Sequence, residues 1–385
     1  MDDLMREHEF AAVARVKRAG MGMVCSLLLA GCPLSGLAAS KPMERIVIAP
    51  DSKGFILAES KRPFHPWGFN YGNRGQLMED FWMDDWKTFA DDFEKMKRLG
   101  ANVVRVHLQY GKFMEAPGKA NGVEFEQLSR MLGVAGQSGL YLDITGLACY
   151  RPADTPAWYD AMAESQRWAA QSNFWHEVAR RCAGSPAVFC YDLMNEPLSP
   201  GAKRQPGQWR SGSSLGGYDF LQFITLDPVG RGREDIPVQW IRAMAAAIRS
   251  CDHQALITVG LLPWTQQWGF LSGFVPVKIA PELDFISVHI YPDSKRPAEA
   301  MDALRRCAVG KPVVIEETFP LSCSAAEEET FLRESKGAAC GWLGHYDGLT
   351  LKDYAALERA GKLTPGQGMY RAWEALFVKL RPQGG

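Results

Sequence analysis

The chain has 385 residues and carries 43 Lys and Arg against 44 Asp and Glu, which gives a formal net charge of −1. This length favours one large catalytic domain with loop insertions over two compact cores. The balanced charge and the lack of a basic tract exclude nucleic acid as an expected partner, because binding to a phosphate backbone depends on clustered Lys and Arg.

The amino-terminal residues have the pattern of an export signal. A basic stretch at 15–18 precedes an apolar stretch at 21–30, and small residues follow. The apolar stretch is too short to span a bilayer as a mature helix. We therefore expect residues 1–40 to direct export and to form a short tether, and residues 41–385 to form the catalytic domain.

The end of this leader also resembles the bacterial lipobox. Leu29 to Cys32 reads Leu-Ala-Gly-Cys, and in a lipobox the cysteine becomes the lipidated first residue of a membrane-anchored protein. Ordinary cleavage near Ala38 or Ala39 is the alternative. We expect an exported protein that is either attached to the cell envelope through a lipidated Cys32 or secreted or periplasmic.

Seven cysteines follow the leader, and this odd number leaves at least one thiol unpaired unless it bridges to another chain. Cys182 and Cys251 fall at the ends of predicted helices and are the first pair to test as a disulfide. The sequence has no Cys-x-x-Cys motif or Cys/His cluster that would suggest a metal site.

Beyond about residue 60, apolar runs alternate with amphipathic helical patterns, as expected of parallel strands joined by helices. We expect strands at 67–71, 102–108, 141–147, 188–195, 256–262, 285–291, 313–317 and 339–343. We expect helices at 84–99, 125–137, 168–182, 238–250, 297–307, 325–336 and 368–380. Eight alternating units favour a TIM (β/α)8 barrel over an open doubly wound sheet, which would more often carry a glycine-rich phosphate turn after its first strand.

A long insertion follows the fourth predicted strand. Residues 198–236 are rich in Gly, Ser, Pro, Gln and Arg, with Trp209, Tyr218 and Phe220 among them. Such a loop lies at the carboxyl end of a barrel, where active sites are built. We expect it to form one wall of the substrate cleft; an insertion without contact to the ligand is the alternative.

Two glutamates end strands of this series. Glu196 and Glu317 each close a short apolar run, about 120 residues apart. A charged group at the end of a buried strand costs desolvation free energy unless it is paired. A chain that keeps such a group therefore either pairs it or uses it. Two carboxyl groups at one end of a barrel are what a glycosidase needs, since one protonates the leaving sugar and the other attacks the anomeric carbon.

The order of strands and motifs resembles glycoside hydrolase family five, of clan A, over nearly all of the chain after about residue 45. In that family the acid/base glutamate follows an asparagine at the end of strand four, and the nucleophile ends strand seven. Asn195-Glu196 and Glu317 match these positions. The resemblance implies a retaining endo-β-glucanase or β-mannanase, with Glu196 as acid/base and Glu317 as nucleophile, that uses no metal ion and no organic cofactor.

Strand seven leaves two residues to choose between. Side chains alternate along a strand, so we expect only one of Glu316 and Glu317 to point into the barrel mouth. Thr318-Phe319-Pro320 departs from the aromatic residue and glycine that often follow the family's nucleophile. Lining up the strand favours Glu317, which leaves Glu316 as a supporting carboxylate.

The resemblance implies five substrate-binding residues. Asn195 would donate a hydrogen bond to the 2-hydroxyl group of the sugar. Arg105, on strand two, would hold the nucleophile anionic through a charged hydrogen bond. His289 and Tyr291 share one face of strand six and would contact the sugar and the nucleophile. Trp342, on strand eight, matches the floor of the sugar subsite beside the scissile bond.

Weaker candidates for the cleft are Trp209, Trp264, Trp268, His107 and Tyr150. Strand three, 142–146, lacks the histidine of many family members, which departs from the standard cellulase subgroup. An exo-acting β-glycosidase, a transglycosylase and a non-catalytic carbohydrate-binding envelope protein remain alternatives. The expected partner is a polysaccharide or oligosaccharide substrate, and we expect a monomer.

Overall fold

The computed structural model describes residues 43–212, 214–264 and 272–382. The predicted leader, with Cys32, and the candidate Trp268 lie outside the described residues. Among the described helices, none is both long enough and apolar enough to cross a membrane.

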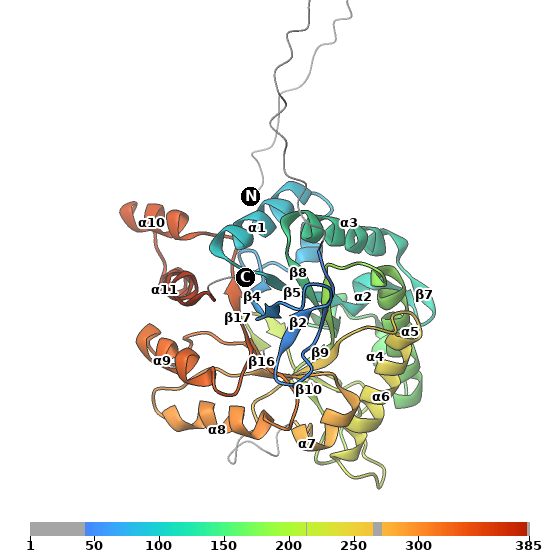
Figure 1. Ribbon diagram of the computed structural model, residues 1–385. Coiled ribbons are helices and arrows are strands. Elements are labelled where there is room, and N and C mark those ends of the chain that lie inside the picture. Colours follow the sequence, from blue (N-terminus) through green and yellow to red (C-terminus); the bar gives the residue numbers. More distant parts are fainter. Residues whose placement is uncertain (1–42, 213, 265–271, 383–385) are drawn as a thin grey trace, which may run out of the picture. The chain divides into compact units, whose positions relative to one another are not determined.

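Eight parallel strands form a closed barrel (Figure 1). In chain order they are β4 (Trp67–Tyr71), β5 (Val103–Gln109), β8 (Tyr141–Ala148), β9 (Val188–Asn195), β14 (Ile257–Leu261), β15 (Ile286–His289), β16 (Val313–Glu317) and β17 (Gly341–Tyr346). Each strand pairs in parallel with the next, and β17 pairs with β4. This closure confirms the predicted TIM (β/α)8 barrel.

Helices connect these strands along the outside of the barrel. The longer ones are α1 (Trp86–Leu99), α3 (Gly122–Ser138), α5 (Glu164–Cys182), α6 (Asp235–Arg249), α8 (Pro297–Cys307), α9 (Ala325–Ser335), α10 (Leu351–Arg359) and α11 (Pro365–Leu380). Short turns of helix are α2 (Tyr110–Phe113), α4 (Ala157–Asp160), α7 (Pro276–Ile279), η1 (Met78–Asp80), η2 (Pro152–Asp154) and η3 (Ala280–Glu282). The predicted bounds of α8 are correct, whereas α10 was not predicted.

Helix α1 illustrates how sequence places these elements. The side chain of Asp85 accepts a hydrogen bond from a first-turn N–H group, and Gly100, with φ of 102°, ends the helix in the left-handed region. Phe89, Phe93 and Met96 are fully buried. Their spacing of three and four residues puts them on one face of the helix, which therefore packs against the barrel.

The amino end of the barrel is covered by a small antiparallel sheet of β1 (Ile46–Ile48), β2 (Phe55–Leu57) and β3 (Pro63–Phe64). The ring of Phe55 lies 5.1 Å from that of Phe189 and 5.2 Å from that of Phe285. This sheet was not predicted. Its aromatic side chains fill the bottom of the barrel with apolar atoms, which keeps water out of that end.

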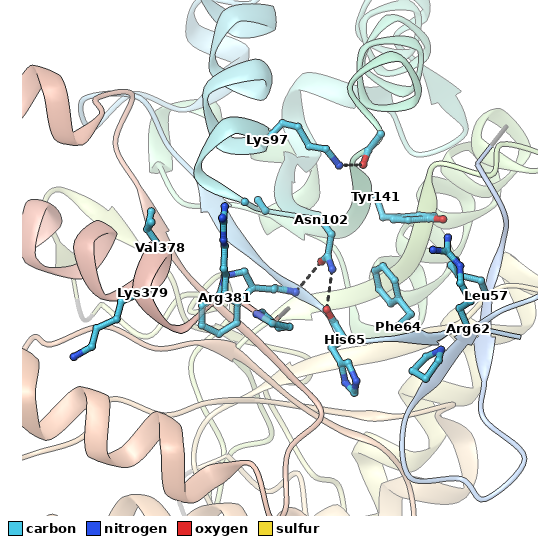
Figure 2. Close-up of a pocket in the computed structure, with 16 residues that line it drawn as sticks. Leu57, Arg62, Phe64, His65, Lys97, Asn102, Tyr141, Val378, Lys379 and Arg381 are labelled. Carbon is cyan, nitrogen blue, oxygen red and sulfur yellow. Dashed lines mark hydrogen bonds between the residues drawn. The ribbon is translucent and has the colours of Figure 1, made fainter. Parts of the chain in front are cut away.

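A cavity of about 970 Å³ lies beside this sheet (Figure 2). At its wall, the side chain of Asn102 accepts a hydrogen bond from the Trp67 N–H group and donates one to the His65 carbonyl, both at 2.8 Å. The Tyr141 hydroxyl donates to the Glu44 carbonyl at 2.7 Å. Trp67 and Tyr141 begin their strands, so the cavity is at the end of the barrel opposite to Glu196 and Glu317.

The remaining strands are short pairs in loops: β6 (Met114–Ala116) with β7 (Lys119–Ala120), β10 (Pro197–Leu198) with β13 (Gln222–Phe223), and β11 (Ser214–Leu215) with β12 (Tyr218–Asp219). The last two pairs belong to the insertion after β9. All seven cysteines of the described part are unbridged, Cys182 and Cys251 included. The predicted disulfide between those two residues is therefore not formed.

Candidate active site

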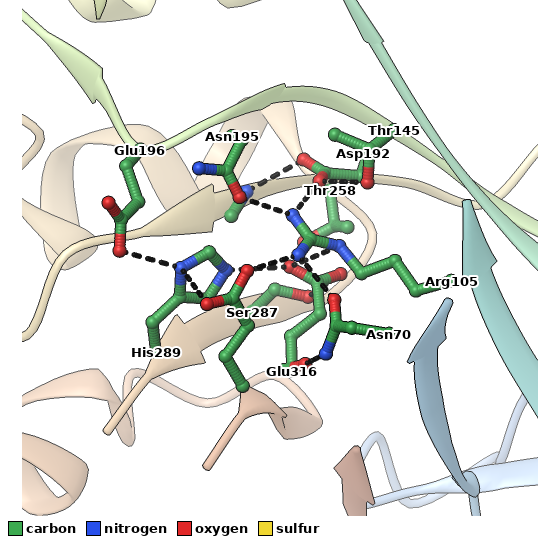
Figure 3. Close-up of polar contacts among 12 residues, drawn as sticks. Asn70, Arg105, Thr145, Asp192, Asn195, Glu196, Thr258, Ser287, His289 and Glu316 are labelled. Carbon is green, nitrogen blue, oxygen red and sulfur yellow. Dashed lines mark hydrogen bonds and ion pairs between the residues drawn. The ribbon is translucent and has the colours of Figure 1, made fainter. Parts of the chain in front are cut away.

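Parallel strands bring their last residues to one end of the barrel, and polar side chains gather there (Figure 3). Asn195 ends β9 and Glu196 follows it; His289 ends β15 and Glu317 ends β16. Tyr291 follows two residues after His289. These residues therefore come from strands four, six and seven and meet at the end where TIM-barrel enzymes carry their chemistry.

Arg105, in the middle of β5, lies at the centre of the cluster and is completely buried. Its Nη1 atom donates to Glu317 Oε1 at 2.6 Å and to Asn70 Oδ1 at 2.8 Å. Its Nη2 atom donates to Asp192 Oδ2 at 2.7 Å and to Asn195 Oδ1 at 3.1 Å. One guanidinium group thus fixes two carboxylates and two amides.

Glu317 is held as an anion. Besides Arg105, it accepts a hydrogen bond from the Tyr291 hydroxyl at 2.5 Å, and the Nδ1 atom of His289 lies 3.6 Å from its Oε2 atom. Burial would raise the pKa of Glu317, but the charges of His289 and Arg105 outweigh burial and hold the pKa well below its usual range. The carboxylate is therefore ionised at neutral pH.

His289 joins the two predicted catalytic residues. Its Nδ1 atom lies 2.9 Å from Glu196 Oε1, and its Nε2 atom lies 3.4 Å from Glu316 Oε2. Burial would lower the pKa of His289, but the charge of Glu317 and the hydrogen bonds to Glu196 and Glu316 raise it to about 10. At neutral pH the ring is an imidazolium, which donates from both nitrogens.

Both glutamates of strand seven turn inward, contrary to the expectation that alternation would send one of them away. Glu316 is fully buried, accepts from the Ser287 hydroxyl at 3.0 Å and lies 3.6 Å from Arg105 Nε. Glu317 is 9% exposed, at the mouth. The register of β15 against β16 shifts between Val288 and His289, and such an irregularity re-aims the side chains beside it.

Asp143, on β8, is a fourth acidic residue inside the barrel and is completely buried. Burial and the charge of Glu316 raise the pKa of Asp143 well above its usual range. Burial would also raise the pKa of Glu316, but Arg105 and His289 lower it. Asp143 is therefore the protonated member of the pair, which avoids a further buried negative charge.

Gly260, on β14, lets the cluster close. Its N–H group donates to Asp192 Oδ1 at 2.7 Å, and its carbonyl accepts from the Glu196 N–H group at 2.9 Å. A Cβ atom at this position would lie 2.8 Å from His289 Nε2 and 2.9 Å from Arg105 Nη2. Only glycine leaves room for both charged groups.

The backbone of Glu196 is unusual for a residue with a side chain, because its φ of 45° lies in the left-handed region. This conformation directly follows the end of β9, and the side chain then reaches His289. Backbone conformations of this kind are held in place by their surroundings and gather at functional sites. Here the hydrogen bond to Gly260 supplies that restraint.

The structure brings together six of the seven predicted site residues: Glu196, Glu317, Asn195, Arg105, His289 and Tyr291. Trp342 is not among them. Its indole N–H group donates to Ser335 of α9 at 2.8 Å, and its ring packs 6.3 Å from that of Trp67 in the core. This placement corrects the expectation of a sugar floor, because Trp342 faces the helices outside the barrel.

His345 occupies the strand-eight position at the mouth instead. Its Nε2 atom lies 2.8 Å from the Tyr291 hydroxyl and 3.9 Å from Glu317 Oε2. Burial lowers the pKa of His345, so the neutral ring can donate to the tyrosine oxygen while the tyrosine donates to Glu317. A strand placed at 341–346 would have put His345 and Trp342 on opposite faces.

Sequence reasoning also missed Asn70 and Asp192, although a polar residue inside an apolar strand was the available signal. Two weaker candidates do reach the cluster: His107 Nδ1 lies 2.5 Å from the Tyr150 hydroxyl, and His107 Nε2 lies 3.4 Å from Asn70 Oδ1. Trp209 does not reach it, since its ring is buried 4.2 Å from the guanidinium carbon of Arg167.

The cluster could also be considered as a cation site. Glu196, His289 and Glu317 each offer one ligand atom, and these atoms lie within 4.8 Å of one another. The protonated ring of His289 has no free lone pair for a metal ion, however, so a cation would have to displace a proton from it. The arrangement suits charge pairing between the imidazolium and the two carboxyl groups better.

Comparison with known families gives one match that spans most of the chain. A family model described as cellulase (glycosyl hydrolase family 5) matches residues 60–340. Mannan endo-1,4-beta-mannosidase 2 of Arabidopsis thaliana is 32% identical over 124 residues, which are 28% of this chain and 22% of that protein. The chain thus matches less than a quarter of that relative's length.

Solved structures share the fold. The beta-1,4-mannanase of the sea hare Aplysia kurodai has a TM-score of 0.59 at 15% identity, over 89% of this chain and 98% of that chain. An exo-beta-1,4-mannosidase from Opitutaceae bacterium strain TAV5 has a TM-score of 0.59 at 19% identity, over 86% of this chain and 62% of that chain. A broad-specificity endoglucanase from an uncultured bacterium has a TM-score of 0.55 at 15% identity, over 81% and 94%.

The requirement for glycine at position 260 can be tested by adding a methyl group there. We expect Gly260→Ala to lower the free energy of unfolding by about 1 to 3 kcal/mol, because the added methyl group overlaps two charged side chains. Urea unfolding would measure the change. Gly136→Ala on α3 is the control, since no heavy atom outside its own helix lies within 4 Å of the added carbon. Equal stability of the two variants would contradict the crowding argument.

The charge of His289 predicts a pH dependence. The group titrates near 6.5 when unfolded and at about 10 when folded, so the folded state binds the extra proton between these values. Its contribution to stability is fully present below about pH 6.5 and is lost as the pH rises through 10, by up to about 1.4 kcal/mol per pH unit. We expect the stability advantage of the wild type over His289→Gln to shrink from pH 7 to 10; a constant advantage would oppose this assignment.

Proposed function

Since the chain belongs to glycosyl hydrolase family 5 and is a glycoside hydrolase, we propose that it cleaves β-linked glycans with retention of configuration. Glu317 acts as the nucleophile and Glu196 as the acid/base. The observation that carries this proposal is the distance between the two carboxyl groups. One oxygen of Glu196 and one of Glu317 lie within 4.8 Å, close to the 5 to 5.5 Å of retaining enzymes and below the 6.5 to 9.5 Å of inverting ones.

The first step is the attack of Glu317 on the anomeric carbon. Its charge is available because the carboxylate is ionised, and Arg105 and Tyr291 hold its two oxygens in place. As the carboxylate forms a bond to the sugar, it loses charge, and the two donors remain to stabilise it when it leaves in the second step. Arg105 is buried, so it cannot turn away from Glu317 toward water.

Glu196 must carry a proton when the bond to the leaving sugar breaks. His289 orients the carboxyl group of Glu196, with Nδ1 2.9 Å from Glu196 Oε1. In our proposal Glu196 gives its proton to the leaving oxygen. Glu196 afterwards takes a proton from the water that hydrolyses the glycosyl enzyme, so the cycle balances.

Asn195 is placed to bind the sugar beside the scissile bond. Its Oδ1 atom is held by Arg105, which directs its Nδ2 atom toward the Phe220 carbonyl, 3.2 Å away. A sugar 2-hydroxyl group that competes for this amide would receive a hydrogen bond that strengthens in the transition state. The orientation of the amide is thus fixed before substrate binds.

The substrate we propose first is β-1,4-linked mannan, with β-glucan second. The sequence relative and two of the structural neighbours are named for action on mannan, and one neighbour is named an endoglucanase. Reducing-sugar release by the purified protein on mannans, β-glucans and xylan tests the choice. We expect turnover of mannan that falls to background in Glu317→Gln. Activity confined to another glycan would overturn the substrate, and activity kept by the variant would overturn the mechanism.

The identity of the nucleophile has a separate test. We expect Glu317→Gly to lose turnover and to regain part of it when azide takes the place of the carboxylate. Glu316→Gly should not respond to azide, because Glu316 lies deeper and is fully buried. Rates with an activated aryl glycoside, with and without azide, measure both. Azide rescue of Glu316→Gly alone would reverse the assignment of the two residues.

A further inference from the structure

The insertion after β9 closes one side of the barrel mouth, and we propose that this makes the enzyme act at the ends of glycan chains instead of at internal bonds. The inference rests on the proposed function, because it concerns how a glycan lies in the same site. It depends on where the residues between Glu196 and α6 make their contacts.

The insertion is anchored at its base and is not a loose segment. β10 and β13 pair in parallel, so the chain returns to its starting point beside β9. The buried side chain of Gln222 donates to the Leu147 carbonyl at 3.1 Å. Trp209 is buried and donates from its indole to the Asp160 carbonyl at 3.0 Å. These contacts fix the direction in which the tip of the insertion projects.

The tip is a hairpin of β11 and β12, which turns through Gly216 and Gly217 with φ of 61° and 88°. Both glycines take the left-handed region that a two-residue hairpin turn needs. The hairpin register pairs Leu215 with Tyr218. The tyrosine therefore sits directly at the turn, at the far end of the insertion from β9.

Two hydrogen bonds hold this hairpin against loops on the far side of the barrel mouth. The Asp219 N–H group donates to the Tyr150 carbonyl, just after β8, at 2.8 Å. The Tyr218 hydroxyl donates to the Gly75 carbonyl, in the loop after β4, at 2.6 Å. In the barrel, β5 lies between β4 and β8. The insertion thus connects the loops of strands four, three and one, and forms a wall past strand two.

The inner side of this wall touches the site itself. The Phe220 carbonyl accepts from Asn195, and the Phe220 ring packs edge-on against Tyr150 with 4.8 Å between centroids. Tyr150 in turn contacts His107. A sugar bound at Asn195 therefore meets Phe220 and Tyr150 on this side. Among the described residues this leaves the opposite direction for a longer glycan, and a site that continues in one direction admits chain ends.

Shortening the hairpin tests this proposal. We compare the wild type with a variant in which residues 214–219 are replaced by two glycines, with Tyr218→Phe and with Tyr141→Phe. The last variant is a matched control, because Tyr141 also donates to a carbonyl, at 2.7 Å, at the other end of the barrel. The readouts are products from mannohexaose over time and the fall in mannan viscosity per reducing end released.

We expect the wild type to release one short product from the outset, with little loss of viscosity. The shortened variant should cut internal bonds and lose viscosity about tenfold faster per reducing end. Tyr218→Phe should shift in the same direction by a smaller factor, because it lacks only one hydrogen bond, and Tyr141→Phe should match the wild type. Should the shortened variant fail to fold, Tyr218→Phe still decides the question.

Three results would count against the inference, and they differ. Wild-type protein that cuts mannohexaose internally from the first turnovers would overturn the chain-end proposal and leave retaining hydrolysis standing. No turnover of any polysaccharide or oligosaccharide would overturn the proposed function together with this inference. An unchanged product pattern in both hairpin variants would show that the wall does not set the mode of action.

Discussion

The buried guanidinium of Arg105 is the interaction on which the rest of the site depends. A charge inside a barrel is costly unless it is paired and hydrogen-bonded. Here Nη1 and Nη2 each bind one carboxylate and one amide, and Glu316 lies 3.6 Å from Nε. Because the guanidinium is planar, these four acceptors have their relative positions set by one rigid group. The orientation of Asn195 and of Glu317 is therefore a property of strand two, although the residues belong to strands four and seven.

The second constraint is the balance of buried charge. Arg105 and the imidazolium of His289 face Asp192, Glu316 and Glu317, and Asp143 keeps its proton. Networks of this kind seldom stabilise a fold beyond what apolar residues of similar volume would achieve. The apolar packing at the amino end, with Phe55, Phe189 and Phe285, supplies stability that the mouth does not. The amino end of the barrel thus stabilises the fold, and the carboxyl end holds the charged groups of the site.

Sequence alone predicted the barrel because its alternating apolar runs and amphipathic helices follow local periodicity. It also found Arg105, His289 and Glu196, since charged or titratable groups in buried strands need a partner. Sequence alone failed where the exact extent or pairing of a strand decides which side chains face the site. The predicted strand eight ended at 343 and left out His345, whereas β17 runs to Tyr346, with Trp342 on its outer face and His345 at the mouth. The shift beside β16 brings both strand-seven glutamates inward, and this depends on pairing between strands far apart in the chain.

The wall formed by the insertion also bears on how successive reactions follow one another. A cleft open at both ends lets a polymer slide forward while the cleaved fragment leaves ahead of it. Under the chain-end proposal, with Tyr218 bound to Gly75 on one side, the fragment next to the wall would leave by the route through which the polymer entered. The remaining polymer then has to dissociate before the fragment can depart. Turnover would accordingly be distributive, with many chains shortened in parallel and none followed to its end.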